Sequence, residues 1–268
     1  MSRLLVKGAP PDADGLMVEV TPASAGWSRV GFSAWRLAPG QKLTWAQSGR
    51  EALAVVLSGE VDALAKDLSP RTIGGRASVF DDLAPAALYA PAGAALTITA
   101  RTTAEIALCT APGGAAGSSR FLDSEGMGLE VRGTGTNRRL VRNILPESEP
   151  AESLLVVEVI TPAGHWSSWP PHKHDSAEAG RETALEETYY HRLRPAQGFA
   201  FQRVYTDDGA IDETLTVHDG DVVLVPRGYH PVGAPHGYEL YYLNVMAGPE
   251  RRWLFRNDPA HAWMVEKR

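Results

Sequence analysis

The chain has 268 residues, of which 44% are hydrophobic and 22% are charged, a balance typical of a folded globular protein and not of a disordered one. Its 26 Lys and Arg residues are outnumbered by 32 Asp and Glu residues. The resulting net charge of −6 argues against a nucleic-acid or anionic-membrane partner, since either would require a basic surface. The single cysteine, Cys109, excludes an intrachain disulfide framework and any metal site built from several thiolates. The first residues contain no apolar signal-peptide core, so we expect a cytoplasmic protein.

The elements predicted along the chain are nearly all short β-strands. Glycine and proline are spread through the chain, as expected for strands that are joined by tight turns. In the first half we predict strands at 16–20, 30–36, 52–57, 61–63, 88–89, 96–99 and 106–109. In the second half we predict strands at 154–160, 188–192, 199–205, 215–217, 222–225 and 240–245. The sequence therefore predicts an all-β protein, either a sandwich or a barrel.

Two segments allow more than one interpretation. The uncharged stretch 83–100 is as long as a membrane span, but it contains Pro85, Pro91 and Gly93. We therefore predict two buried strands separated by a turn, and no membrane association. The polar segment 176–187 could be a loop or a short helix.

The chain contains an internal repeat. Segment 82–95 (DLAPAALYAPAGAA) has the same rhythm as segment 217–230 (VHDGDVVLVPRGYH), and Glu51 and Glu187 precede the two segments at a similar offset. Segment 111–119 (APGGAAGSS) has a flexible composition and makes a natural boundary. We therefore predict an N-terminal unit at 1–115, a linker at 116–135 and a C-terminal unit at 136–268.

All eight histidines lie in the second half of the chain. His172 and His174 are two residues apart, which places both imidazoles on the same face of a strand. Glu187 lies in the strand-like run ETYYHR, and His230 follows a P-x-G turn. Three imidazoles and one carboxylate could hold a divalent metal ion and leave coordination positions open for water or substrate.

These motifs resemble those of the cupin superfamily. Segment 220–230 matches the second cupin motif, G-x5-P-x-G-x-H, and His172-x-His174 followed by a glutamate resembles the first. In cupins these three histidines and the glutamate bind one metal ion inside a small β-barrel. The resemblance implies a bicupin: two tandem cupin barrels of the double-stranded β-helix or jelly-roll-like form, with few short helices. The N-terminal copy has no histidine and has Ala95 at the position of His230, so we expect it to be a metal-free structural domain.

The chain departs from the cupin pattern in the position of the glutamate. Glu187 lies thirteen residues after His174, whereas cupins generally place this ligand much closer to the second histidine. We interpret residues 175–186 as an inserted loop. Glu182 and Glu186 therefore stay open as alternative ligands.

Five further segments resemble the 5-deoxy-glucuronate isomerases of myo-inositol catabolism, a bicupin family similar to the 5-keto-4-deoxyuronate isomerases. They are PPHKHD, LEETYYHRL, GFAFQRVYTDD, VPRGYHPV and LYYLNVMAGPERRW. The resemblance spans nearly the whole chain and is densest from residue 133 to residue 253. It implies an aldose–ketose isomerase that converts 5-deoxy-D-glucuronate to 5-dehydro-2-deoxy-D-gluconate. It also implies one divalent metal ion with the ligands His172, His174, Glu187 and His230; we favour zinc, and manganese, iron and nickel stay open.

Strand alternation and charge suggest which residues act on the sugar. Counting from Glu187, Tyr189 and His191 face the barrel interior, so they are our candidates for proton transfer, although a hydride shift would need no such base. The substrate carboxylate requires a cation that can bind both of its oxygens, and we expect Arg203 to face inward for this purpose. Its strand neighbours Gln202 and Tyr205 are further candidates for substrate contacts. Arg251 and Arg252 are alternatives to Arg203.

Two other function classes stay open on the sequence alone. A different metal-dependent cupin enzyme, such as a dioxygenase, a decarboxylase or a 5-keto-4-deoxyuronate isomerase, would carry the same ligand set. A sugar-binding bicupin without turnover is the second alternative. In either case the expected partner is a small uronate sugar, and homo-oligomerisation through strand edges stays open.

Overall fold

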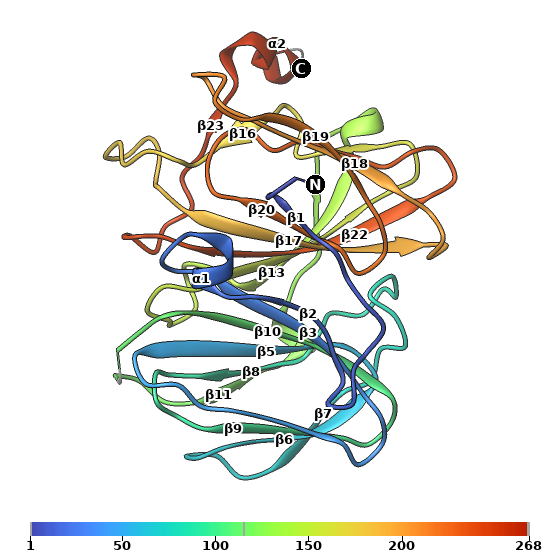
Figure 1. Cartoon of the computed structure of the whole chain (residues 1–268), viewed down its shortest axis with the longest axis vertical. Helices are drawn as coiled ribbons and strands as arrows, with labels where there is room; N and C mark the ends of the chain where they lie inside the picture. The colour runs from blue at the N-terminus through green and yellow to red at the C-terminus, as the bar shows by residue number, and fades with distance from the viewer. Residues whose placement is uncertain (1, 115, 267–268) are drawn as a thin grey trace.

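A computed structural model describes residues 2–114 and 116–266 of the chain. Its regular structure is almost entirely β-strand, arranged as two barrels that Figure 1 shows one above the other, with the N-terminal barrel below. Each barrel is made of one large and one small antiparallel sheet, and the two large sheets face each other across the middle of the molecule. The expected all-β architecture of two tandem barrels is confirmed.

The N-terminal barrel combines a six-stranded and a four-stranded sheet. The large sheet has the order β11 (Arg120–Leu122), β8 (Ala87–Ala90), β5 (Arg50–Ser58), β10 (Ala104–Pro112), β3 (Gly31–Leu37), β2 (Leu16–Val20). The small sheet has the order β4 (Lys42–Trp45), β9 (Leu96–Ala100), β6 (Glu60–Ala65), β7 (Arg71–Gly74). The uncharged stretch 83–100 thus forms the buried strands β8 and β9 with a turn between them, as the sequence predicted.

The C-terminal barrel repeats this plan. Its large sheet has the order β1 (Leu5–Val6), β20 (Val222–Val225), β17 (Glu186–Arg194), β22 (Glu239–Ala247), β14 (Leu155–Thr161), β13 (Arg139–Leu145), β12 (Glu130–Arg132). Its small sheet has the order β15 (Trp166–Ser167), β21 (Val232–Gly233), β18 (Ala200–Tyr205), β19 (Asp212–Val217). A separate pair consists of β16 (His172–Lys173) and β23 (Arg256–Asn257).

The helices are short and lie outside the sheets. They are α1 (Pro22–Ala25), α2 (Trp263–Glu266) and the 3₁₀ turns η1 (Ser124–Gly126), η2 (Gly135–Asn137) and η3 (Pro259–His261). Among the described residues, no helix combines the length and the apolar character that a membrane crossing demands. The segment 176–185 is a loop, and β17 begins directly after it at Glu186.

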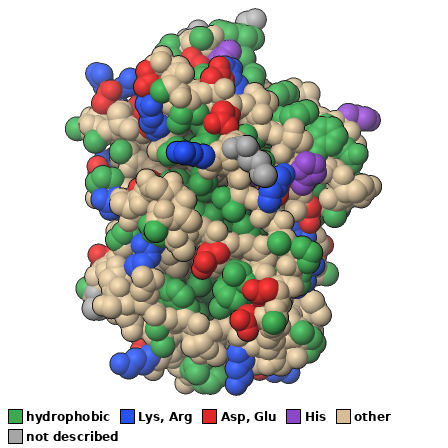
Figure 2. Space-filling view, in the orientation of Figure 1, with side chains coloured by type: hydrophobic (Ala, Val, Ile, Leu, Met, Phe, Trp, Pro, Cys, Tyr) green, Lys and Arg blue, Asp and Glu red, His purple; other side chains and the backbone are tan. Residues whose placement is uncertain are grey.

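Acidic and basic side chains are mixed on the surface. Figure 2 shows Lys and Arg side chains interspersed with Asp and Glu side chains on one face of the molecule, without a single basic field. This distribution agrees with the net charge of −6, and it offers a nucleic-acid backbone no continuous cationic track on that face.

Each large sheet contributes to two cores. On β5, the even-numbered residues 52–56 pack inside the N-terminal barrel, while the odd-numbered residues 53–57 pack against the large sheet of the other barrel. On β17, Tyr189 packs inside the C-terminal barrel, and its neighbour Tyr190 packs between the two barrels. Strands that are buried on both faces read as nearly continuous apolar runs, which explains the sequence ALAVVL in β5.

Short strands cross the boundaries that the sequence predicted. β1 belongs to the expected N-terminal unit, yet it pairs with β20 of the C-terminal barrel. Within the expected linker, β11 pairs with β8 of the N-terminal barrel, and β12 pairs with β13 of the C-terminal barrel. These strands are structured because each extends the edge of a large sheet, where unpaired backbone groups need partners.

Two glutamates connect the barrels across their interface. Glu51 on β5 accepts hydrogen bonds from the backbone N–H groups of residues 152–154, at 2.6 to 2.8 Å, and from the hydroxyl of Tyr89 at 2.6 Å. Glu186 on β17 accepts in the same way from the backbone N–H groups of residues 28–30, at 2.8 to 3.0 Å. Each barrel therefore holds the segment that leads into a large-sheet strand of the other barrel.

We expect Glu51→Ala to destabilise the protein, because three backbone N–H groups lose their acceptor at a position where the glutamate is fully buried. The cost is about 3 kcal/mol, and the melting temperature falls by about 6–10 °C. The matched variant Glu186→Ala acts on a more exposed site, where water replaces the carboxylate, so it costs about 1 kcal/mol. Thermal unfolding followed by circular dichroism measures both, and equal losses would contradict the proposed importance of Glu51.

Candidate metal centre

The two barrels differ at the start of their equivalent strands β5 and β17. Ala52 on β5 pairs with the β8 residue that precedes the P-x-G turn, and Glu187 on β17 pairs with the corresponding residue of β20. Ala52 is therefore the counterpart of Glu187, and Glu51 is the counterpart of Glu186. The expected match of Glu51 with Glu187 is wrong by one residue, and a shift of one residue moves a side chain to the opposite face of a sheet. Thus Glu51 faces the other barrel, whereas Glu187 faces the interior of its own.

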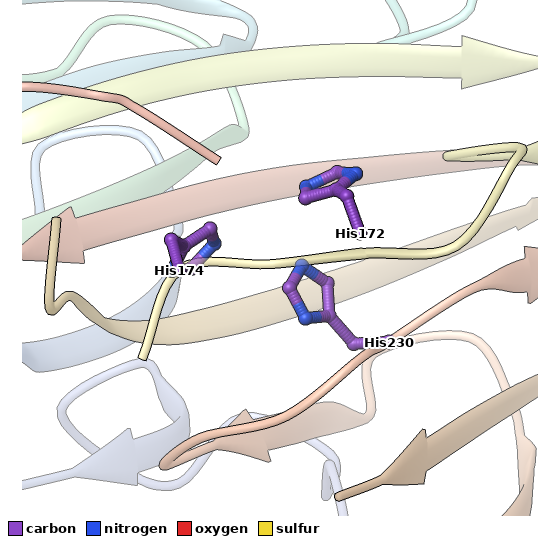
Figure 3. Close-up of side chains that lie close together, drawn as sticks. All are labelled: His172, His174 and His230. Atoms are coloured by element: carbon purple, nitrogen blue, oxygen red, sulfur yellow. The ribbon is translucent and has the colours of Figure 1, made fainter. Parts of the chain in front are cut away.

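Three histidines meet inside the C-terminal barrel. His172 on β16 and His174 just after it come from one segment, and His230 comes from the segment that follows β20 (Figure 3). One ring nitrogen from each lies within 4.8 Å of the corresponding nitrogens of the other two, and all three residues are buried. The spacing of two between His172 and His174 puts both rings on one side of the chain, as the sequence predicted.

Glu187 is the carboxyl group that faces these histidines. Its Oε2 lies 3.0 Å from Nε2 of His174 and 3.2 Å from Nε2 of His230. Its Oε1 accepts a hydrogen bond of 2.5 Å from the amide of Asn244 on β22, which holds the carboxyl plane in place. Glu187 is 1% exposed, so an ionised form requires compensating positive charge nearby.

The alternative ligands Glu182 and Glu186 are engaged elsewhere. Glu182 accepts hydrogen bonds from the backbone N–H groups of Asp175 and Ser176, at 2.8 and 3.1 Å, and so closes the loop that the sequence predicted. Glu186 lies on the opposite face of β17, where it binds residues 28–30 of the other barrel. Neither carboxyl group therefore points toward the histidines.

The hydrogen bonding of His230 prepares it to bind a metal ion. Its Nδ1 lies 2.8 Å from the backbone oxygen of Gly228, which can only accept, so Nδ1 carries the proton and Nε2 carries the lone pair. That buried Nε2 has no hydrogen-bond partner among the described residues. An orphaned imidazole nitrogen beside two more imidazoles and a carboxyl group fits the donor set of a divalent metal ion.

The pKa values of the imidazoles favour the neutral forms that ligation requires. Burial lowers the pKa of His172 well below 6.5, and the nearby His230 and His174 lower it further. Burial likewise lowers the pKa of His230 to about 4. Burial also acts to lower the pKa of His174, but the hydrogen bond to Glu187, the charge of Glu187 and backbone hydrogen bonds together outweigh it and raise the pKa. His172 and His230 are thus neutral at neutral pH, and a bound cation could take the place of a proton on His174.

A cavity of about 230 Å³ opens beside the histidines. Its wall includes His172, Tyr189 and Asn244, and the ring of Phe255 lies 4.6 Å from that of His172. A larger cavity, of about 450 Å³, lies against β2 to β4 of the N-terminal barrel, but its lining contains no histidine. The smaller cavity is therefore the one that gives a small polar molecule access to the candidate metal ligands.

Tyr189 and His191 face the barrel interior, as alternation along β17 predicted. Their rings stack at a centroid distance of 6.0 Å, and Tyr189 lines the cavity whereas His191 does not. Burial raises the pKa of Tyr189 well above 10, and the charge of Glu187 adds to this. Burial lowers the pKa of His191 to about 4. At neutral pH the cavity therefore meets a protonated phenol, with a neutral imidazole stacked against it.

The expected inward position of Arg203 is wrong. β18 alternates so that Gln202 and Val204 are buried, which turns Arg203 toward solvent with 44% of its side chain exposed. Its Nε and Nη2 donate to the carboxylate of Asp212 on the neighbouring β19, at 2.8 and 2.9 Å. Because adjacent strand residues face opposite sides, Gln202 and Arg203 cannot both enter the barrel.

The other expected substrate contacts also lie away from the cavity. Gln202 is buried and accepts a hydrogen bond of 2.9 Å from Nε2 of His191. The hydroxyl of Tyr205 donates to Asp258 at 2.6 Å. Neither residue lines the 230 Å³ cavity, and the alternative Arg251 donates to backbone oxygens of residues 146, 147 and 154.

Asn244 and Arg139 are among the cavity-wall residues that the sequence did not predict. Asn244 is the one amide in the apolar run LYYLNVM, and an isolated polar residue in a buried strand was a usable signal. Arg139 lines the cavity from the start of β13. It was missed because no strand was predicted at 139–145, so no facing could be assigned to its side chains.

The sequence matches one protein family over nearly its whole length. The model of the KduI/IolB family matches residues 4–264. A 5-deoxy-glucuronate isomerase from Geobacillus kaustophilus is 51% identical over 268 residues, covering 100% of this chain and 97% of that protein. A 5-deoxy-glucuronate isomerase from Bacillus subtilis (strain 168) is 48% identical over 253 residues, covering 94% of this chain and 93% of that protein.

Solved structures support the cupin fold. An IolB-like protein from Salmonella typhimurium superposes with a TM-score of 0.94 at 47% identity, covering 98% of this chain and 99% of that one. An oxalate decarboxylase from Lactobacillus farciminis superposes with a TM-score of 0.64 at 13% identity, covering 100% of this chain and 91% of that one. At 13% identity the second likeness concerns the fold alone.

We expect Glu187→Gln to weaken binding of a divalent metal ion at least tenfold, because the substitution keeps the shape but removes the charge that faces the histidines. Glu182→Gln is the matched control: its side chain is equally buried but binds a loop, so metal affinity should not change. Competition with a chelator, together with elemental analysis of the purified proteins, measures both. A loss in Glu182→Gln and none in Glu187→Gln would reverse the assignment.

Proposed function

Because the chain belongs to the KduI/IolB family, we propose that it is a metal-dependent aldose–ketose isomerase that converts 5-deoxy-D-glucuronate to 5-dehydro-2-deoxy-D-gluconate in myo-inositol catabolism. The observation that carries this proposal is the 51% identity, over the full chain, to a 5-deoxy-glucuronate isomerase. The candidate metal centre and the small cavity beside it support the same reaction class.

In this proposal one divalent ion is held by His172, His174, Glu187 and His230. The orphaned Nε2 of His230, the short distances from Glu187 to two of the rings, and the lowered pKa of His172 support this set. Zinc is the metal we favour, since imidazole nitrogen and carboxylate oxygen are both common zinc ligands. Bound there, a divalent ion supplies Lewis acidity toward the carbonyl and the adjacent hydroxyl oxygen of the sugar.

The reaction moves one proton from C2 to C1 of the aldose and another from the C2 hydroxyl to the carbonyl oxygen. Tyr189 lines the cavity and keeps its proton at neutral pH, so it donates a hydrogen bond or a proton to a sugar oxygen. His191 does not line the cavity but contacts the rings of Tyr189 and Tyr242, which do, and it acts by positioning the ring of Tyr189. Gln202 holds His191 through its hydrogen bond and thus belongs to the same supporting layer.

The cavity limits the partner to a small molecule. A volume of about 230 Å³ accommodates a sugar acid and excludes a folded macromolecule. The buried, unpaired thiol of Cys109 agrees with a reducing compartment, so we place the enzyme in the cytoplasm. Assembly into a homo-oligomer stays a prediction.

Removal of the metal ion tests the proposed reaction. Incubation of purified protein with 5-deoxy-D-glucuronate should produce the ketose, and a strong chelator should abolish this activity without unfolding the protein. Restoring zinc, manganese, iron or nickel one at a time should recover it and rank the metals. Absence of ketose in every metal-loaded sample would overturn the proposed function. Oxygen consumption in its place would favour a dioxygenase.

Neighbouring tyrosines test the role of the phenol. Tyr189→Phe should lower kcat about 100-fold, since it removes the only hydroxyl that β17 presents to the cavity, and it should leave the metal content unchanged. Tyr190→Phe is the matched control, because that hydroxyl donates to Glu105 between the barrels. Steady-state kinetics of both variants decide the matter: equal kcat values for Tyr189→Phe and wild type would remove Tyr189 from the mechanism.

A further inference from the structure

One arginine in the cavity wall has no acidic partner among the side chains that the structure describes. Arg139 donates a single hydrogen bond, from Nη1 to the backbone oxygen of Asn137 at 3.2 Å. Within residues 2–114 and 116–265, no carboxyl group forms an ion pair with its guanidinium. Arg132 lies directly opposite across the β12–β13 pair and differs in this respect, since it is paired with Glu130 at 2.7 Å. The wall therefore carries one compensated and one uncompensated cation.

The surroundings of Arg139 make an anion favourable there. Its side chain is partly buried, and burial lowers its pKa, with a further decrease from the charge of Arg132. Arginine nevertheless stays protonated at neutral pH, so the cost of this partly desolvated charge is not removed by loss of a proton. A carboxylate that enters the cavity would supply the missing countercharge and accept two parallel hydrogen bonds from the guanidinium.

The turn before β13 leaves room for the guanidinium. Gly133 adopts φ +77°, a left-handed conformation that favours glycine. A Cβ atom at this position would lie 2.2 Å from the backbone oxygen of Asn137 and 3.1 Å from Nη1 of Arg139. Any larger residue at position 133 would therefore crowd the space that Arg139 occupies at the cavity wall.

Arg139 and the candidate metal ligands share one cavity but come from different strands. Alternation along β13 puts Arg139 on the same face as Val141, which also lines the cavity together with His172. Arg139 and His172 both line the 230 Å³ cavity, so the guanidinium and the imidazole border the same space. A uronate carries its carbonyl and its carboxylate at opposite ends, as this arrangement of ligands and cation requires.

We infer that Arg139 binds the carboxylate of the uronate and thereby directs the aldehyde end of the sugar toward the histidines. The inference deepens the proposed function and rests on it. It assigns to Arg139 the role that the sequence suggested for Arg203. A residue of β13 would then favour a sugar acid over a neutral sugar. Arg139 is thus a specificity-determining residue.

The test compares Arg139→Met with Arg203→Met in the zinc-loaded protein. Arg139→Met should lower kcat/KM for 5-deoxy-D-glucuronate about 30- to 100-fold, through a raised KM, because a charge-assisted bidentate contact is lost. It should leave unchanged the slow turnover of the neutral aldose in which a CH2OH group replaces the carboxylate. Arg139→Lys should recover part of the loss, and Arg203→Met should behave as wild type, since that side chain is paired at the surface.

A second readout does not depend on turnover. Calorimetric titration with D-glucuronate should show binding to wild type and to Arg203→Met, and binding weakened at least tenfold in Arg139→Met, with equal metal content in all three. If wild type binds D-glucuronate but converts no 5-deoxy-D-glucuronate, the proposed function fails while the binding data still decide the role of Arg139. Equal losses for acid and neutral substrates, unchanged affinity in Arg139→Met, or no binding to wild type would each overturn the inference.

Discussion

A carboxyl group buried in the interior of a β-barrel is the constraint on which the site depends. Glu187 is almost inaccessible to water, and the interior of a barrel offers little that can stabilise a negative charge. The chain surrounds it with the amide of Asn244 and with the imidazoles of His174 and His230. These contacts gather three imidazoles and one carboxyl group in one place, a group that could hold a divalent cation.

The N-terminal barrel packs against the strand that bears Glu187 but contributes no residue to the candidate metal centre. It has Ala52 and Ala95 where the other barrel has Glu187 and His230, and Ala52 packs in the apolar core of this barrel. Its large sheet instead covers the outer face of β17, which turns that strand into one buried on both sides. As a result β17 presents Glu187 and Tyr189 to its own barrel, while Glu186 and Tyr190 on its other face form hydrogen bonds with the neighbouring barrel.

Local patterns predicted the grouping of the candidate metal ligands better than the residues that line the cavity. The His-x-His spacing and the P-x-G-x-H turn encode their geometry within a few residues, so His172, His174 and His230 could be placed from the sequence. Whether Arg203 points into the barrel depends on which alternate residues of β18 face inward. Gln202 takes the interior position, so Arg203 points to solvent. Arg139 lies on a strand that the sequence did not predict, because the run RLVRNIL shows neither strict alternation of polar and apolar residues nor a continuous apolar stretch.

The sequence by itself determined the all-β class, the repeat of two barrels, and the confinement of every histidine to the second one, because turn chemistry and residue content are local properties. Only the tertiary structure decided that Glu187, and not Glu182 or Glu186, faces the histidines, and that Arg139 replaces Arg203 at the cavity. The physical reason is that a side chain's partner is set by strand register and by packing between distant segments. When two repeats are matched one residue out of register, a side chain expected in the interior of a barrel lies on its outer face. The similarity of the two repeats does not reveal such a shift.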